Sequence, residues 1–187
     1  MLNIIQSPSK NYFKGRSGHK PELIVVHCTD GAYPGDLNWL KGGGTSQVSS
    51  HYLVTPGGEV IQLVKDEDVA WHAGVVVSPS ARLLKPGVNP NLYTIGIETS
   101  LRPNARMTEA QECALKELVK LVAERHGIPL DRDHIIGHKE IRASKSCPGT
   151  ISVDKLVMDL QSPVVTPPQL VDKETFKRTI INFIKSL

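Results

Sequence analysis

The feature that most constrains the fold is a short, uninterrupted apolar run at residues 23–26, Leu-Ile-Val-Val. A run of this length that is apolar on both faces is typical of a central strand buried on both sides. Polar residues begin at its carboxyl end with His27, and α/β sheets place ligands at that end of their strands. We therefore expect an α/β fold, with a central mixed β-sheet flanked by helices and a functional site at the strand ends.

Further strands are predicted where β-rich segments alternate or are bounded by turn residues. Residues 56–58, Pro-Gly-Gly, separate two such segments and predict a β-hairpin. Glu98 lies near the end of a third. The strands expected after the first are residues 51–54, 60–64, 93–99 and 134–136. The segments 68–74 and 75–92 are expected to be loops.

Helical spacing and capping residues predict three helices in the same region. The clearest is residues 109–125, which opens with the capping-box pattern of residues 108–111 and ends before Gly127. A shorter helical pattern covers residues 36–40. The last helix of the region begins after Ser152, a favourable N-cap.

The chain is expected to divide into one domain and a short appendage. Residues 1–160 form the expected catalytic domain, in which residues 1–20 show no clear period and predict a surface arm. Residues 161–171 are Pro-rich and predict a linker. Residues 172–187 carry an apolar stripe at helical spacing, so we expect an amphipathic helix. That helix could dock on the domain, pair with another copy or meet a partner, which predicts a monomer or a weak homodimer.

Charge and composition disfavour several functional classes. The formal net charge is only +3 and no block of Lys and Arg occurs, so we expect no nucleic-acid partner. The apolar runs are a few residues long, so we expect no membrane insertion. Residues 1–6 lack the charged and apolar regions of a secretory signal, which predicts synthesis in the cytoplasm. Three cysteines, an odd number, give no disulfide framework and favour a reducing compartment.

The turn-rich stretch of residues 136–149 concentrates groups that bind metals. His138 and Cys147 can both reach one Zn²⁺ if the loop between them folds back. A catalytic zinc site uses three protein ligands and leaves one position open. The stretch offers two ligands, so a third must come from elsewhere in the chain.

Six short blocks, in order along the chain, carry a resemblance to a known family. The blocks are Ile24-Val25-Val26-His27, Ser50-His51-Tyr52-Leu53-Val54, Trp71-His72-Ala73-Gly74, Ile95-Gly96-Ile97-Glu98, Ile136-Gly137-His138 and Lys145-Ser146-Cys147-Pro148-Gly149. The sequence resembles the type-2 N-acetylmuramoyl-L-alanine amidases. That family includes bacteriophage lytic amidases and is related to the animal peptidoglycan recognition proteins. The resemblance covers residues 20–160 and rests on the order of the six blocks, since any single block is common.

The resemblance implies one Zn²⁺ held by His27, His138 and Cys147. The residue types agree with this, because neutral imidazole and thiolate are good zinc ligands and bound Zn²⁺ deprotonates a thiol. Three such ligands leave the fourth position free for water.

Two other residues compete for the metal on sequence grounds. His134 would share a helical face with His138, but the residues between them are typical of a strand and a turn. Cys28 adjoins His27, and adjacent side chains of a strand point to opposite faces. Both residues of that pair cannot easily bind one metal, so we expect Cys28 to be packed.

Glu98 is the expected general base. A carboxylate at a strand end that faces the metal water could take its proton and later deliver the proton to the leaving amine. Some relatives of the family place a Tyr immediately before the His of the hairpin block. Here that position is Ser50, which favours Glu98.

The resemblance also implies groups that meet the substrate. Lys145 is expected to stabilise the oxyanion of the tetrahedral intermediate. His72 is expected to donate a hydrogen bond to the muramoyl group or to that oxyanion. Asn91 matches a family position near the substrate and is expected to bind it. Trp71 is expected to bind substrate by stacking on a sugar ring, and packing within the protein is the alternative that the sequence leaves open.

These expectations together favour a zinc-dependent amidase. It would hydrolyse the amide between the lactyl group of N-acetylmuramic acid and the L-alanine of the peptidoglycan stem peptide. Cys147 and the C-terminal helix favour a phage endolysin or a prophage-encoded lytic enzyme. Such an enzyme is held in the cytoplasm until a holin releases it to the wall.

Three alternatives stay open. A non-catalytic peptidoglycan-binding module typically lacks the thiol ligand that Cys147 supplies. A cytosolic amidase that recycles anhydro-muropeptides usually carries Asp at that position. A Cys–His hydrolase with Cys147 as the nucleophile fits His138 but leaves His27 and Lys145 unexplained.

Overall fold

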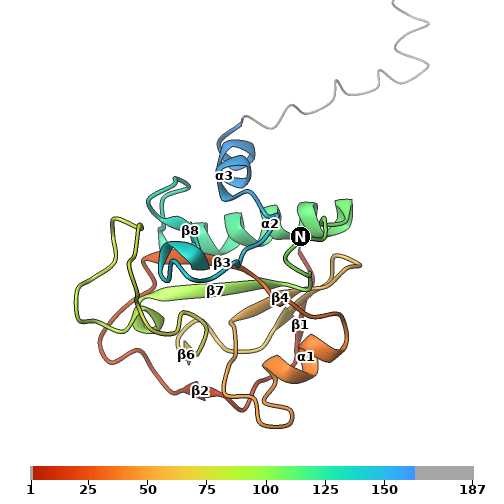
Figure 1. The fold of residues 1–187 in the computed structure, drawn as a ribbon, viewed down its shortest axis with the longest axis horizontal. Helices are drawn as coiled ribbons and strands as arrows, with labels where there is room; N and C mark the ends of the chain where they lie inside the picture. Colours follow the sequence, from red (N-terminus) through yellow and green to blue (C-terminus); the bar gives the residue numbers. More distant parts are fainter. Residues whose placement is uncertain (1, 163–187) are drawn as a thin grey trace, which may run out of the picture.

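The computed structural model describes residues 2–162 and is built on one six-stranded sheet (Figure 1). Its strands, in spatial order, are β1 (Ile4–Gln6), β5 (Val60–Gln62), β4 (Tyr52–Val54), β7 (Thr94–Thr99), β3 (Leu23–Cys28) and β8 (Ile135–Gly137). The hairpin β4–β5 is antiparallel and the other neighbouring pairs are parallel. The sheet is therefore mixed, as the sequence predicts, with β3 buried between two parallel neighbours.

Helices cover both faces of this sheet. The long helix α2 (Glu109–His126) and the shorter α3 (Val153–Gln161) lie on one side, and α1 (Gly35–Leu40) lies on the other (Figure 1). A second, two-stranded sheet pairs β2 (Tyr12–Phe13) with β6 (Val69–Ala70). Two 3-10 turns, η1 (Pro90–Leu92) and η2 (His138–Glu140), precede β7 and follow β8. Within residues 2–162, none of the helices combines the length and the apolarity that a membrane span requires.

Strand alternation divides the central side chains between two cores. In β3, Ile24 and Val26 join the large core beneath α2 and α3. Leu23 and Val25 join the smaller core on the opposite face. His27 has the parity of Leu23 and Val25, so its imidazole projects on the face away from α2. This orientation determines which polar residues of the neighbouring strands can contact the His27 imidazole.

The capping signals place α2 as the sequence predicts. Thr108 accepts from the backbone N–H of Gln111, while the Gln111 side chain accepts from the backbone N–H of Thr108. Gly127 ends the helix in the left-handed conformation at φ 66°. Ser152 likewise caps α3 by accepting from the N–H of Lys155.

The expectation of a surface arm at residues 1–20 is wrong for much of that segment. β1 extends the main sheet beside β5, and β2 pairs with β6. Arg16 is buried, and its guanidinium donates to the backbone carbonyls of Asp66, Leu92 and Thr94. The segment lacks a clear period because its strands lie at sheet edges and its anchoring contacts come from backbone carbonyls that no sequence pattern reveals. The predicted linker 161–171 and helix 172–187 fall, from residue 163 on, outside the described residues.

A buried carboxylate joins α2 to the sheet. Asp66 accepts hydrogen bonds from the Tyr52 hydroxyl at 2.6 Å, from Arg125 at 2.7 Å and from His126 at 2.8 Å. Burial alone would raise the pKa of Asp66, but the hydrogen bonds from Tyr52, His126 and Arg125 outweigh it and hold that pKa below its usual value. Asp66 therefore stabilises the fold in its charged form.

Asp66→Asn is expected to lower the free energy of unfolding at pH 7 by about 1.5–3 kcal/mol, the range for hydrogen bonds to charged groups. Because the folded pKa is lowered, the stabilisation is full above the ordinary carboxyl pKa of about 3.9 and is lost as the pH falls through the folded pKa. Urea unfolding of the two proteins between pH 7 and pH 3 measures this. Asp159→Asn, which breaks exposed pairs with Lys116 and Lys155, is the control. A D66N deficit that stays constant down to pH 3 would contradict the assignment.

Candidate metal centre and catalytic cleft

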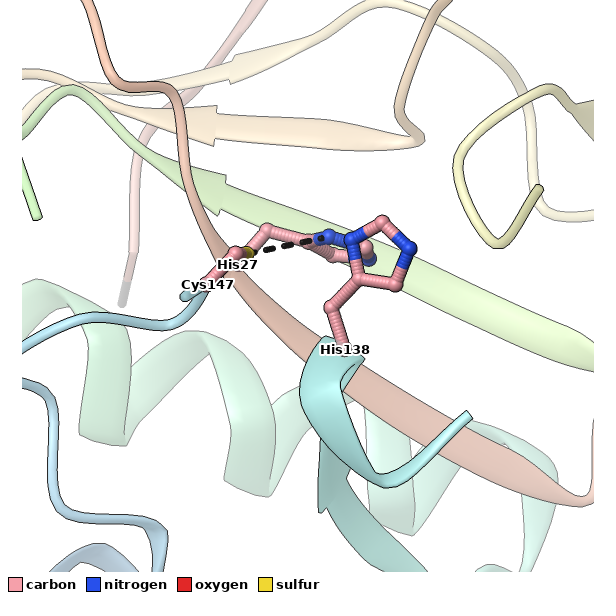
Figure 2. A group of neighbouring side chains, drawn as sticks. All are labelled: His27, His138 and Cys147. Carbon is pink, nitrogen blue, oxygen red and sulfur yellow. Dashed lines mark hydrogen bonds between the residues drawn. The ribbon is translucent and has the colours of Figure 1, made fainter. Parts of the chain in front are cut away.

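Three side chains that the sequence predicts as metal ligands lie together at one end of the sheet (Figure 2). His27 is near the carboxyl end of β3, His138 directly follows β8, and Cys147 comes from the loop after η2. Because β3 and β8 are parallel neighbours, their carboxyl ends meet at the same edge. The ligand atoms of the three residues all lie within 4.8 Å of one another, and Cys147 Sγ is 3.6 Å from His27 Nδ1.

His138 is oriented by the backbone. Its Nε2 lies 3.1 Å from the carbonyl oxygen of Ala73, which can only accept, so this nitrogen carries the ring proton. In a neutral ring the lone pair is then on Nδ1. In Figure 2 one ring nitrogen of His138 faces His27 and Cys147 while the other points away from them. His138 therefore offers Nδ1 to the metal site.

The two histidines are in the neutral form that metals require. Burial, followed by the nearby His72, His138 and Lys145, holds the pKa of His27 well below its usual value. Burial and then Lys145 lower the pKa of His138 to about 4. At neutral pH both rings keep a lone pair for a ligand.

Cys147 is a protonated thiol in the metal-free protein. Its pKa is raised by its hydrogen bond with Cys28, by burial and by the neighbouring Glu98. The backbone N–H of Cys28 also donates to Cys147 Sγ at 3.3 Å. A metal that binds here must displace the thiol proton, as metals do at cysteine ligands.

This donor set fits zinc. Two imidazole nitrogens and one sulfur suit a borderline-soft ion, and three protein donors match the open catalytic type of zinc site. The adjacent oxygen Oε2 of Glu98 is buried and has no hydrogen-bond partner within residues 2–162. Such a buried, unpartnered acceptor beside three converging donors indicates that the site is built to receive further ligands.

Glu98 lies beside His27 because of strand register. β7 pairs with β3 so that Glu98 is opposite His27, and Glu98 Oε1 is 3.9 Å from His27 Nδ1. In the metal-free protein, burial and the nearby Cys28 and Asp36 raise the pKa of Glu98 to about 8, against the opposing effect of Lys145. A carboxyl group whose proton affinity is raised towards neutrality suits proton transfer.

A cleft of about 210 Å³ opens over these groups. Its walls include the three candidate ligands, Glu98, Lys145, Trp71 and His72, together with residues 28–30, 48–49, 103 and 146. Lys145 therefore lies within the same cleft as the candidate ligands and Glu98. Its positive charge lowers the pKa values of His27, His138 and Glu98, so it acts electrostatically on the whole site.

Trp71 is one of the residues that line the cleft. Its ring lies 5.0 Å from the ring of Phe13 in β2, a contact that the sequence does not indicate. The indole nitrogen is buried without a hydrogen-bond partner within the described chain. As a residue of the cleft wall, Trp71 is a candidate for substrate contact.

His72 and Asn91 have contacts other than the expected ones. His72 is buried, and its ring nitrogens face His27 at 3.1 Å and Thr94 at 3.1 Å. Asn91 is buried and is not among the residues that line this cleft, and its Oδ1 accepts from the backbone N–H groups of His72 at 3.2 Å and Ala73 at 2.9 Å. Its side chain thus holds the His72 segment, and its expected role in substrate binding stays a prediction.

Sequence reasoning missed Thr94 and the carbonyl of Ala73. Thr94, Gly96 and Glu98 share one parity in β7, so all three lie on the face that carries His27. That parity was readable once Glu98 was singled out, and it points to Thr94. The Ala73 carbonyl could not be found this way, because a backbone acceptor leaves no residue-type signal.

One zinc ion per chain is the expected metal content of protein purified with zinc. Cys147→Ala is expected to weaken zinc binding by more than about 100-fold. Removing a residue that only hydrogen-bonds to a metal ligand already costs up to about 100-fold, so removing the ligand itself should cost more. Chelator competition measures the affinity, and mass spectrometry measures the metal content. Cys28→Ala, which removes the adjacent thiol, should keep its zinc. Equal losses in the two variants would contradict the assignment of Cys147 as the ligand.

Comparison with known proteins identifies a family for this chain. The family model described as N-acetylmuramoyl-L-alanine amidase matches residues 17–150. Two curated relatives are named 1,6-anhydro-N-acetylmuramyl-L-alanine amidase AmpD. The one from Haemophilus influenzae is 32% identical over 95 residues, which are 51% of this chain and 48% of that protein. The one from Citrobacter freundii is 26% identical over 160 residues, with 76% of this chain and 81% of that protein covered. The chain thus spans about half the length of the Haemophilus relative.

Solved structures show the same fold. An AmpD selenomethionine derivative superposes with a TM-score of 0.70 at 24% identity, covering 87% of this chain and 99% of that one. A mutant endolysin from Bacillus subtilis gives a TM-score of 0.65 at 24% identity, covering 86% of this chain and 99% of that one. At these identities the likeness establishes the arrangement of sheet and helices.

Proposed function

The chain belongs to the N-acetylmuramoyl-L-alanine amidase family, and from this we propose that it is a zinc-dependent hydrolase of the amide between N-acetylmuramic acid and L-alanine in peptidoglycan. The observation that carries the proposal is the convergence of His27, His138 and Cys147 on one point beside Glu98. Metal ligands and a candidate base meet at the carboxyl ends of three adjacent parallel strands, β8, β3 and β7, and the loop that follows them.

The chain's own residues account for the proton transfers of the reaction. Zn²⁺ in such a site supplies Lewis acidity, which acidifies water and polarises a carbonyl. Glu98 takes a proton from the attacking water as the new C–O bond forms, and its unpartnered Oε2 is the available acceptor. The same carboxyl then delivers that proton to the nitrogen of L-alanine as the C–N bond breaks. The products are the muramoyl carboxylate and a free amino terminus.

Lys145 has the position and charge to stabilise the oxyanion. It lines the cleft with Glu98 and the candidate ligands, and its charge already shifts the pKa values of the neighbouring groups. Removing one donor of this kind typically costs about 2.7–4 kcal/mol of transition-state stabilisation. Trp71, which lines the same cleft, is the candidate for contacting the substrate.

Glu98→Gln is expected to keep zinc and lose amide hydrolysis by at least about 100-fold, since the amide cannot accept the proton. The assay measures new L-alanine amino termini released from purified cell walls, alongside bound zinc. Removal of zinc by chelation should abolish release in the wild type, and added Zn²⁺ should restore it. Full turnover by E98Q would rule out Glu98 as the base, and full turnover by metal-free protein would rule out the zinc mechanism.

For the substrate, we propose polymeric peptidoglycan, with the chain acting as a phage or prophage lytic enzyme. The support is Cys147 as the candidate third ligand, since the family resemblance implies Asp at that position in the recycling enzymes. The fold favours neither candidate, because it is shared with both AmpD and an endolysin. Release through a holin would bring such an enzyme to the wall. The second candidate is a recycling amidase, which the names of the curated relatives favour because they specify a 1,6-anhydro-muramyl substrate.

The two candidates differ in the substrate they prefer. A lytic enzyme is expected to have a higher kcat/KM on intact glycan strands than on a soluble anhydro-muramyl peptide. Parallel assays on both substrates, with E98Q as the blank, measure the ratio. A clear preference for the soluble anhydro-muramyl peptide would replace the lytic assignment with the recycling one.

A further inference from the structure

A second histidine lies directly behind the metal-facing His27. The Nε2 atom of His27 is 3.1 Å from Nδ1 of His72, and the two rings meet edge to face at 89°. One of these nitrogens must donate and the other must accept. Which one donates decides whether His27 can offer Nδ1 to a metal.

The far side of His72 settles the direction. Its Nε2 is 3.1 Å from the hydroxyl oxygen of Thr94, and that hydroxyl donates its own hydrogen to the carbonyl of Pro90 at 2.9 Å. The oxygen of Thr94 can therefore only accept from His72, which places the His72 proton on Nε2. In a neutral ring Nδ1 of His72 then accepts from His27 Nε2–H. The lone pair of His27 is left on Nδ1, the atom that faces Cys147 Sγ.

His72 is neutral, as this chain of hydrogen bonds requires. Its ring is buried, and its two nitrogens face the ring of His27 and the hydroxyl of Thr94, so no carboxylate within the described residues is hydrogen-bonded to it to compensate a positive charge. A protonated ring would present two N–H groups, and the one at Nδ1 would donate to His27 Nε2, which would place the His27 proton on Nδ1 and block that atom for a metal. The buried surroundings disfavour that form.

The sheet and the loop hold the His72 ring in place. A side chain at Gly96 would put its Cβ 2.4 Å from Cγ of His72, so the ring occupies space that only glycine leaves in β7. Asn91 fixes the backbone of His72 and Ala73 through two N–H bonds. The carbonyl of Ala73 in turn accepts from Nε2 of His138. One clamped dipeptide thus contacts both candidate histidine ligands from behind.

We propose that His72 is a positioning residue which, through the Thr94 hydroxyl, fixes His27 in the tautomer that presents Nδ1 to the metal. Ala73 does the same for His138 through its carbonyl. His72 helps to form the cleft wall, but both of its ring nitrogens are engaged, so its role is to position His27 and not to donate a hydrogen bond to substrate. Metal-binding histidines generally need a partner for their second nitrogen, and here that partner is another histidine whose own proton is fixed by a threonine. This inference rests on the proposed zinc-dependent function.

Thr94→Val tests the proposal with little change in shape. It removes the acceptor of His72 Nε2–H. His72 then either keeps an unpaired buried N–H or moves its proton to Nδ1, where it can no longer accept the hydrogen bond from His27. Either outcome is expected to weaken zinc binding by about 10- to 100-fold. Thr94→Ser keeps the hydroxyl and should restore an affinity close to that of the wild type.

Thr99→Val is the matched control. Thr99 lies on the same strand, is fully buried, and has a hydroxyl without a partner within residues 2–162. The same substitution there should leave zinc affinity unchanged. Zinc affinity is measured by competition with a chromophoric chelator, and circular dichroism checks that each variant is folded.

Nitrogen-15 NMR of the metal-free proteins reads the tautomers directly. The wild type is expected to show His27 and His72 protonated at Nε2, and T94V is expected to show a shifted or mixed tautomer at one or both rings. Wild-type zinc affinity and tautomers in T94V would overturn the proposal. A fall in kcat with unchanged zinc affinity would also overturn it, by assigning His72 to the substrate. Failure of the wild type to bind zinc would instead overturn the proposed function, so the two failures are distinguishable.

Discussion

The site depends on the parallel pairing of β3 with β7 on one side and β8 on the other. Because all three strands run the same way, their carboxyl ends deliver His27, Glu98 and His138 to one edge of the sheet. The register between β3 and β7 sets Glu98 directly beside His27. A slip of one residue would move Glu98 to the face under α2, where the core is apolar. The large buried core that fixes this register therefore also fixes the position of Glu98 beside His27.

Much of this arrangement could be predicted from the sequence because it follows from the spacing of apolar residues and from residue type. The apolar run 23–26 predicts the buried strand, and the capping box predicts α2. Strand alternation predicts that the side chains of His27 and Cys28 point to opposite faces of the sheet. Cys28 does pack in the core beneath α2. The convergence of His27, His138 and Cys147 needed the resemblance as well, since residues more than a hundred positions apart carry no local signal of contact.

The remainder depends on tertiary contacts that residue patterns do not encode. The N-terminal segment pairs through backbone groups of two sheet edges, so its irregular sequence gave no hint of β1 or β2. The Asn91 side chain clamps backbone N–H groups, a contact that its residue type permits but does not require. The partner of His27 is His72, for which the family resemblance implies a substrate contact. Only the series of hydrogen bonds that runs from His27 to Pro90 shows which ring nitrogens are left to bind a metal.

Zinc K-edge X-ray absorption of the zinc-loaded protein tests the central claim most directly. The account predicts one sulfur donor at about 2.3 Å and two imidazole nitrogens at about 2.0–2.1 Å, with a fourth light-atom donor completing the shell. Loss of the sulfur signal in Cys147→Ala but not in Cys28→Ala would identify the thiolate. A zinc shell without sulfur, or one with fewer than two imidazoles, would contradict the account.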